Sequence, residues 1–265
     1  MKSKLFLLIF IAAACHAVAQ DDYDCYDKFF KRSTKPTSAA KIILVQKDGK
    51  SVTLQAFLKD YEMEGSMSQP NYGLIDLDKD GKQELVINTF TGGAHCCDEF
   101  YFYTNTAVNK YSFAAKTFAG DVCVNDKNEF SFNFYQQFGY FFTCFACAYE
   151  DTTTNAPKQV SGISLQYNKS KLEVVPPAAD LKTTITNNLT KLSKQPYKKL
   201  ATEDEFDNGL RKEFAMNLAV YYYSFGKNLT ETQALFIKFY KYPDAQKVWK
   251  AFAEQLQALK ENNSF

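Results

Sequence analysis

Four acidic side chains stand at short intervals between residues 76 and 84, with the type and spacing of a calcium-binding loop. Calcium takes roughly six to eight oxygen ligands, and a loop that turns sharply can wrap carboxylates at alternate positions around one ion. Gly81 supplies the turn, and residue 82 can offer its main-chain carbonyl, as the seventh residue of such loops does. We therefore predict a calcium site with these ligands: Asp76, Asp78, Asp80, Lys82 and Glu84.

The residues after this loop distinguish it from an EF-hand. The twelfth position, where an EF-hand places a bidentate glutamate, is Ile87, and residues 85–90 are β-branched and aromatic rather than helix-forming. The loop is therefore expected to lead into a strand, with Glu84 at its edge closing the coordination shell. A plain acidic turn is the alternative, and for a bound ion a structural role is favoured over a catalytic one.

The run from Asp76 to Ile87 resembles the calcium loop and strand of FG-GAP or VCBS-type repeats, which occur in β-propeller blades of extracellular proteins. The following segment, Gly-Gly-Ala-His-Cys-Cys at 92–97, is similar to one found after such loops in bacterial exported proteins of uncharacterised function. The resemblance covers about residues 72–104 and implies the same five ligands, propeller-blade-like hairpins and no established chemistry. Only one such loop is clear in the chain, which falls short of a full propeller.

His95 is the single histidine left after the first 19 residues, and it precedes Cys96 and Cys97. A zinc site completed by Cys144 and Cys147 is one interpretation, because zinc takes four such ligands. Disulfides are favoured instead, because an exported chain with an even number of cysteines usually pairs them. The pairing stays open among six residues: Cys25, Cys96, Cys97, Cys123, Cys144 and Cys147.

Two catalytic interpretations of these residues are weaker. Cys144 and Cys147 have the spacing of a thiol-disulfide oxidoreductase, but their neighbours are strand-like, whereas that motif begins a helix. A nucleophilic triad would need His95, and no Gly-x-Ser-x-Gly turn accompanies it.

Two further groups are interpreted as structural. Tyr221–Tyr223 suits the core of an amphipathic helix better than a sugar-stacking surface. A cluster of acids suits the exposed first turn of a helix, which the helix dipole favours: Glu203, Asp204, Glu205 and Asp207.

The N-terminus has the charge, apolar core and small residues of a secretory signal. Lys2 and Lys4 precede an apolar run over 5–14, and residues 17–19 offer a cleavage site. We expect cleavage after Ala19 and export to the periplasm or the extracellular space. A rival route is lipidation at Cys15, because residues 12–15 loosely resemble a lipobox, although its usual first Leu is missing.

The net charge gives no support to a nucleic-acid partner, and the hydropathy gives none to a transmembrane helix. Removing residues 1–19 takes away two of the 31 lysines and arginines and none of the 30 acids, so the net charge falls from +1 to about −1. That balance gives no electrostatic footprint for nucleic acid. No later stretch approaches the roughly 20 apolar residues of a transmembrane helix. A protein or a glycan is the expected partner, and the oligomeric state stays open.

β-strands are predicted to position the acidic loop. Residues 41–58 read as two short strands around a tight turn at Asp48–Gly49, with Phe57 on the second. Val122–Phe130 is interpreted as a turn between strands. Strand-like segments separated by turn residues cover 83–90, 99–104, 110–118, 129–135, 138–149, 160–168 and 171–175.

Helical periodicity begins after Pro176–Pro177. A second helix is predicted to start at Thr202 and a third at Thr230, each with a capping box, and a fourth follows Pro243–Asp244. The first helix has apolar residues at three- and four-residue steps: Leu181, Ile185, Leu189 and Leu192.

These patterns predict an α+β protein: a signal peptide over 1–19, a β-rich calcium-loop domain over 20–176 and a helical domain over 177–265, packed as two subdomains. The expected function is a calcium-stabilised, non-catalytic binding or interaction module at the cell envelope. The alternative is a metal-dependent enzyme acting on an extracellular polymer, with the acidic loop or His95 in its active site. A carboxylate-lined pocket beside the loop would favour the enzyme.

Overall fold

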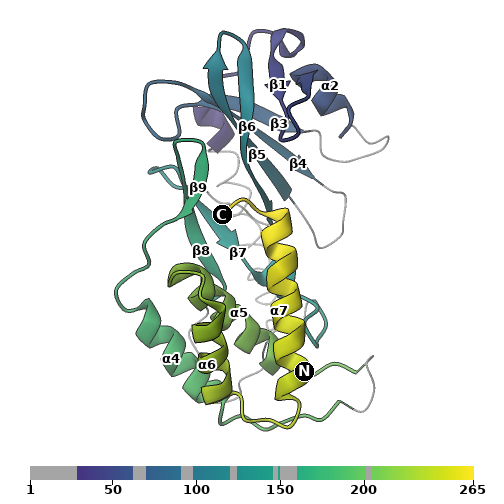
Figure 1. The fold of residues 1–265 in the computed structure, drawn as a ribbon, viewed down its shortest axis with the longest axis vertical. Helices are drawn as coiled ribbons and strands as arrows, with labels where there is room; N and C mark the ends of the chain where they lie inside the picture. The colour runs from purple at the N-terminus through teal and green to yellow at the C-terminus, as the bar shows by residue number, and fades with distance from the viewer. Residues whose placement is uncertain are drawn as a thin grey trace, which may run out of the picture.

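The computed structural model describes residues 29–61, 70–90, 98–119, 124–145, 149, 160–200 and 205–265. These residues form a mixed α+β protein, as predicted (Figure 1). A six-stranded sheet occupies the upper part of the view and a three-stranded sheet the middle, and the helices of the second half of the chain lie below.

The six-stranded sheet carries the acidic loop. Its strands are β1 (Ile43–Val45), β2 (Ser51–Thr53), β3 (Asn71–Ile75), β4 (Glu84–Phe90), β5 (Asp98–Ala107) and β6 (Lys110–Ala119), in the order β2-β1-β6-β5-β4-β3. The four strands from β3 to β6 follow one another as an antiparallel meander, and β1 joins β6 in parallel. The sequence analysis did not predict β3, which pairs along its whole length with β4.

The three-stranded sheet is antiparallel and has the order β7-β8-β9. Its strands are β7 (Glu129–Asn133), β8 (Gly162–Asn168) and β9 (Lys171–Val174). Along β8, Ile163, Leu165 and Tyr167 are buried while the residues between them are exposed. The alternation arises because successive side chains of a strand point to opposite faces.

The predicted hairpin after residue 41 is confirmed in β1 and β2, but its second strand is shorter than expected. Phe57 lies on α2 (Leu54–Lys59) and not on a strand. The Thr53 hydroxyl caps this helix by accepting a hydrogen bond from the Ala56 N–H at 3.1 Å. Leu54 and Phe57 then pack on one face of the six-stranded sheet, in a cluster with Leu85 and Ile87.

The strand predicted over 138–149 is wrong for the residues that the structure describes there. Tyr135–Phe138 forms the short helix α3, and residues 139–145 follow as irregular backbone. Phe142 has a φ of 57°, a left-handed conformation that no regular strand contains. The aromatic residues of this segment had indicated a strand, but here they pack around a helical turn: Phe138 stacks on Phe252.

Four longer helices follow: α4 (Leu181–Leu192), α5 (Leu210–Ser224), α6 (Leu229–Phe239) and α7 (Ala245–Asn262). The first and fourth agree with the prediction. The third has its cap at Asn228, whose side chain accepts a hydrogen bond from the Glu231 N–H at 3.1 Å, and not at Thr230. The second begins at residue 210, after Gly209 with a φ of 83°, and residues 205–209 before it are not helical; its predicted start at Thr202 lies outside the described residues. None of the helices in the described ranges is long and apolar enough to cross a membrane.

One hydrophobic core runs through most of the molecule. It joins one face of the six-stranded sheet, including Val86 and Phe102, to the three-stranded sheet, including Phe130, and to helices α4–α7, including Phe214 and Phe252. The smaller cluster under α2 covers the other face of the six-stranded sheet. Residues before and after 176 therefore contribute to the same apolar interior.

Candidate metal centre

The acidic loop joins β3 to β4 and is held at both ends. Ile75 pairs with Glu84 where the two strands meet, so the loop is the connection of an antiparallel pair. Leu77, in its middle, is 1% exposed and belongs to the main core. Glu84, the first residue of β4, is 2% exposed and therefore carries its carboxylate into the protein.

Three of the predicted ligands come together. Asp76, Asp78 and Glu84 each offer one carboxylate oxygen, and these oxygens all lie within 4.8 Å of one another. Calcium binds oxygen at about 2.3 to 2.6 Å, so two ligands of one ion lie at most about 5 Å apart. The three carboxylates are therefore close enough to share a single ion.

Hydrogen bonds within the loop fix two of these carboxylates. Asp76 accepts from the main-chain N–H groups of Asp80, at 3.1 Å, and Gly81, at 3.0 Å. Asp78 accepts from the Asp80 N–H at 3.3 Å. Lys79 and Gly81 have φ values of 60° and 88°, which turn the chain back on itself. The loop is thus shaped by its own acidic side chains.

The burial of Glu84 beside two other carboxylates makes its ionisation unfavourable. The pKa of its carboxyl is raised to about 7, mainly by burial and also by the charges of Asp78 and Asp80, although a 2.9 Å hydrogen bond from the Leu77 N–H lowers it. No lysine or arginine within the described ranges makes an ion pair with Asp76, Asp78 or Glu84. A divalent cation would remove this repulsion, and hard carboxylate oxygens are the donors that calcium takes.

The loop also contacts the three-stranded sheet. The Lys169 N–H, in the turn between β8 and β9, donates to Asp78 Oδ2 at 3.0 Å. From the turn before β7, the Asn128 side-chain amide donates to the carbonyl oxygens of Asp76, at 3.3 Å, and Leu77, at 3.1 Å. The sequence analysis missed Asn128 and Lys169, because their role depends on a contact far along the chain. The candidate centre thus lies where the two sheets meet.

The other predicted metal ligands lie on the open side of the loop. Asp80 and Lys82 are exposed, and Asp80 Oδ1 accepts from the Lys82 N–H at 2.8 Å. Neither belongs to the carboxylate cluster. Their part in metal binding, through a carboxylate and a main-chain carbonyl, stays a prediction.

The predicted His95 and cysteine chemistry falls mostly outside the described residues. His95, Cys25, Cys96, Cys97, Cys123 and Cys147 all lie there. Cys144 is disulfide-bonded, and its partner is among the residues that are not described. Cys144 therefore offers no free thiol for redox chemistry or zinc.

Two cavities that the described residues form lie away from the acidic loop. The larger, of about 510 Å³, lies between β8 and the segment that leads into α4. The smaller, of about 150 Å³, lies between α3 and the end of α7. Neither cavity is lined by a residue between 76 and 84.

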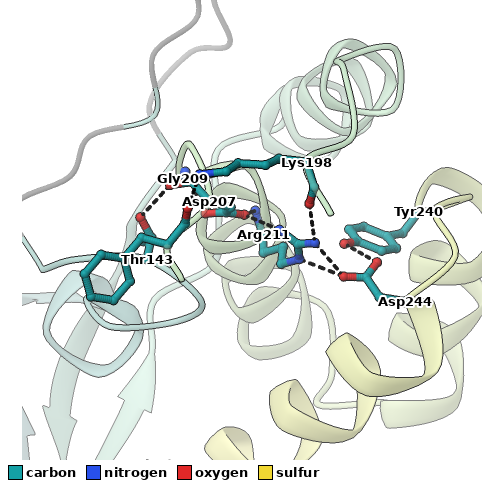
Figure 2. Close-up of polar contacts among 8 residues, drawn as sticks. Thr143, Lys198, Asp207, Gly209, Arg211, Tyr240 and Asp244 are labelled. Atoms are coloured by element: carbon teal, nitrogen blue, oxygen red, sulfur yellow. Dashed lines mark hydrogen bonds and ion pairs between the residues drawn. The ribbon is translucent and has the colours of Figure 1, made fainter. Parts of the chain in front are cut away.

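A second polar cluster surrounds Arg211 on α5 (Figure 2). Its guanidinium donates to Asp207 Oδ2 at 2.9 Å, to Asp244 Oδ2 at 2.8 Å and to the Lys198 carbonyl at 3.0 Å. Tyr240 donates to the second oxygen of Asp244 at 3.0 Å. Each nitrogen of the guanidinium thus has an oxygen partner within the protein, so the cluster links the start of α5 to the start of α7.

The position of Asp207 differs from the one that the sequence predicted. It was expected on the exposed first turn of a helix, but it is 6% exposed and precedes the helix. Its carboxylate accepts from the N–H groups of Gly209, at 2.8 Å, and Arg211, at 3.1 Å, so it caps α5 while pairing with the arginine. Glu205 lies outside any helix, and Glu203 and Asp204 are outside the described residues.

Comparisons of the chain with protein-family models, with curated proteins and with solved structures found no match.

Proposed function

We propose that this protein is an exported calcium-binding protein in which the ion has a structural role. The observation that carries the proposal is the meeting of the Asp76, Asp78 and Glu84 carboxylates within 4.8 Å, with Glu84 buried and no ion-pair partner among the described residues. Asp80 and the Lys82 carbonyl complete the proposed shell from the open side of the loop.

The contacts of the loop support a structural ion. Asp78 receives the Lys169 N–H from the β8–β9 turn, and Asn128 holds the carbonyl oxygens of Asp76 and Leu77. An ion at this place would fasten the six-stranded sheet to the three-stranded sheet. Neither of these two cavities is lined by a residue of the loop, so neither of them supports the enzyme alternative. The proposed role is therefore non-catalytic binding, at the cell envelope, of a protein or a glycan.

The resemblance to FG-GAP or VCBS-type repeats remains part of this proposal. Propeller blades are four-stranded antiparallel sheets. The meander β3–β6 consists of four consecutive antiparallel strands, with the acidic loop between its first two, which supports the resemblance. Export rests on the signal-like N-terminus with cleavage after Ala19.

Calcium is expected to raise the melting temperature of the mature protein. An ion that binds the folded state alone, at a hundredfold excess over its Kd, stabilises by about 2.7 kcal/mol, which corresponds to about 5 to 10 °C for a chain of this size. Asp78→Asn removes one charged ligand and should abolish most of the rise. The measurement is thermal unfolding by circular dichroism with calcium and with chelator.

Asp126→Asn is the matched control, because Asp126 lies in an exposed turn outside the loop. This variant should keep the full calcium response. Magnesium should give a smaller rise, because it requires a tighter octahedral shell. Equal melting temperatures of the unmodified protein in calcium and in chelator would refute the proposal.

A further inference from the structure

The larger cavity lies between the start of β8 and the segment that connects β9 to α4. Its volume of about 510 Å³ falls within the range of small-molecule sites, roughly 300 to 1,000 Å³. The cavity is lined by residues of β7 and β8, the connecting segment, the start of α4 and the end of α5. None of the lining residues has an ionisable side chain.

One wall of this cavity is rich in hydrogen-bonding groups. The hydroxyls of Ser161, Ser164 and Ser224 face no hydrogen-bond partner within the described protein. A hydroxyl donates one hydrogen bond and accepts two, so each of the three can serve a ligand in either role.

Main-chain groups add to this wall. The Phe134 N–H donates to the Ser161 carbonyl at 2.7 Å, and the Val175 N–H donates to the Ser164 carbonyl, on the opposite edge of β8, at 2.8 Å. Because main-chain groups alternate between the two edges of a strand, the N–H and C=O of Gly162 point away from β7. In the register of β8 and β9, the residue opposite Gly162 is Pro177, which has no N–H with which to pair. The Gly162 groups are therefore left facing the cavity.

Another part of the lining is apolar. It consists of the segment Val175–Ala178 and Leu181 on α4. A ligand that fits this lining has both hydroxyls and C–H groups. An uncharged ligand fits best, because none of the lining residues can pair with a charge.

We propose that this cavity binds an uncharged, hydroxyl-rich ligand of the size of one or two sugar residues. The sugar hydroxyls bond to the serine hydroxyls and to Gly162, and a C–H face packs against the two prolines. An added peptide strand fits less well, because it needs a run of free main-chain pairs and Gly162 supplies one. The inference rests on the proposed binding role, whose ligand class it names, and not on the metal.

Titration of the mature protein with glucose, maltose and cellobiose, followed by NMR, tests the site. At least one of these sugars should bind with a Kd in the millimolar range or tighter. Ala178→Trp, which fills the cavity, should weaken that binding at least tenfold. Ala107→Trp, at an exposed alanine on the end of β5, should leave the affinity unchanged. Glucuronate should bind at least tenfold more weakly than glucose, because its carboxylate meets no cation in the lining.

Absence of binding by all three sugars, equal binding by the Ala178→Trp protein, or equal affinity for glucuronate and glucose would each overturn the inference. Melting curves of both tryptophan variants establish that they fold. The calcium response of the melting temperature is measured on the same samples. A preserved calcium response without sugar binding overturns this inference alone, and sugar binding without a calcium response overturns the proposed metal site alone.

Discussion

Arg211 and Glu213 stand two positions apart on α5, and burial affects them in different ways. The Arg211 side chain is 2% exposed, but it lies between the carboxylates of Asp207 and Asp244 and between the rings of Phe142 and Tyr197. Glu213 is half-buried, and its carboxylate makes no hydrogen bond or ion pair within the described part of the chain. The Arg211 charge is therefore compensated by two carboxylates, whereas the Glu213 charge has no such partner among the described residues.

Arg211→Met should lower the free energy of unfolding by about 3 to 5 kcal/mol, because it leaves Asp207 and Asp244 without their cation in a buried site. Urea unfolding at neutral pH measures the loss. Lys250→Met is the matched control, since Lys250 pairs with Glu254 at 3.9 Å on the exposed surface of α7. It should change the free energy by less than about 1 kcal/mol.

The cause of this loss can be separated from lost packing. Adding Asp207→Asn to Arg211→Met removes one of the uncompensated charges and should recover part of the stability. A double variant no more stable than Arg211→Met, or a single variant that costs less than about 1 kcal/mol, would show that the ion pairs do not stabilise this junction.

Glu213 makes stability depend on pH. Burial raises the pKa of its carboxyl to about 7, although the neighbouring Lys212 lowers it. The unfolded chain loses this proton near pH 4.5 and the folded protein near pH 7. The contribution of Glu213 to the free energy of unfolding therefore falls as the pH rises from about 4.5 to 7, and it stays low above pH 7. Glu213→Gln should stabilise the protein by about 1 to 3 kcal/mol at pH 8 and have little effect at pH 4.

Denaturant unfolding of both proteins across this pH range measures the difference. Glu231→Gln is the control, because Glu231 occupies the first turn of α6 but is exposed. Its effect should stay within about 0.5 kcal/mol. A stabilisation by Glu213→Gln that is the same at pH 4 and pH 8 would contradict the role of ionisation.

At the scale of elements, residues 263–265 tie α7 to both sheets. Asn263 Oδ1 accepts from the Phe118 N–H at 2.7 Å, and Ser264 exchanges two hydrogen bonds with the main chain of Lys116, so this segment covers an edge of β6. The Phe265 ring packs on Phe132 of β7 and on Tyr223 of α5. Figure 1 shows α7 running up to this edge. Strand β7 and helix α5 thus both contact the Phe265 side chain.

Phe265→Ala should therefore destabilise the protein by about 2 to 4 kcal/mol, somewhat less than a fully buried phenylalanine because Phe265 is partly exposed. Phe206→Ala removes the same atoms from a side chain that is 51% exposed and should cost less than about 1 kcal/mol. Urea unfolding midpoints measure both effects. Equal costs for the two variants would mean that the Phe265 contacts do not stabilise the junction.

At the scale of the molecule, the continuous core predicts cooperative unfolding. Buried residues of both sheets and of helices α4–α7 belong to one cluster, so neither half can lose its packing without exposing apolar surface of the other. Differential scanning calorimetry of the mature protein should show a single transition. Its calorimetric enthalpy should equal the van't Hoff enthalpy.

With calcium bound as proposed, this transition should move as a whole, because the acidic loop contacts both sheets. Two separated transitions, of which calcium moves only one, would instead indicate two domains that unfold independently. That outcome would support the boundary at residues 176–177 that the sequence predicts.

The sequence by itself determined the features that depend on neighbouring residues. The spacing of Asp76, Asp78, Asp80 and Glu84 around Gly81 predicted the acidic loop. Three- and four-residue periodicity predicted α4, and Pro243–Asp244 marked the start of α7. Local patterns suffice here because turns, strands and amphipathic helices are set by residues a few positions apart. The mixed α+β class follows from the same patterns.

Only the tertiary structure decided which of these elements contact one another. The Asp78 carboxylate accepts a hydrogen bond from Lys169, which is 91 residues away in the sequence, and Arg211 donates one to Asp244, which is 33 residues away. Aromatic residues over 138–149 favoured a strand locally, but Phe138 ends the short helix α3 and stacks on Phe252 of α7. Burial and charge compensation depend on partners that the fold brings from far along the chain, and no local pattern contains them.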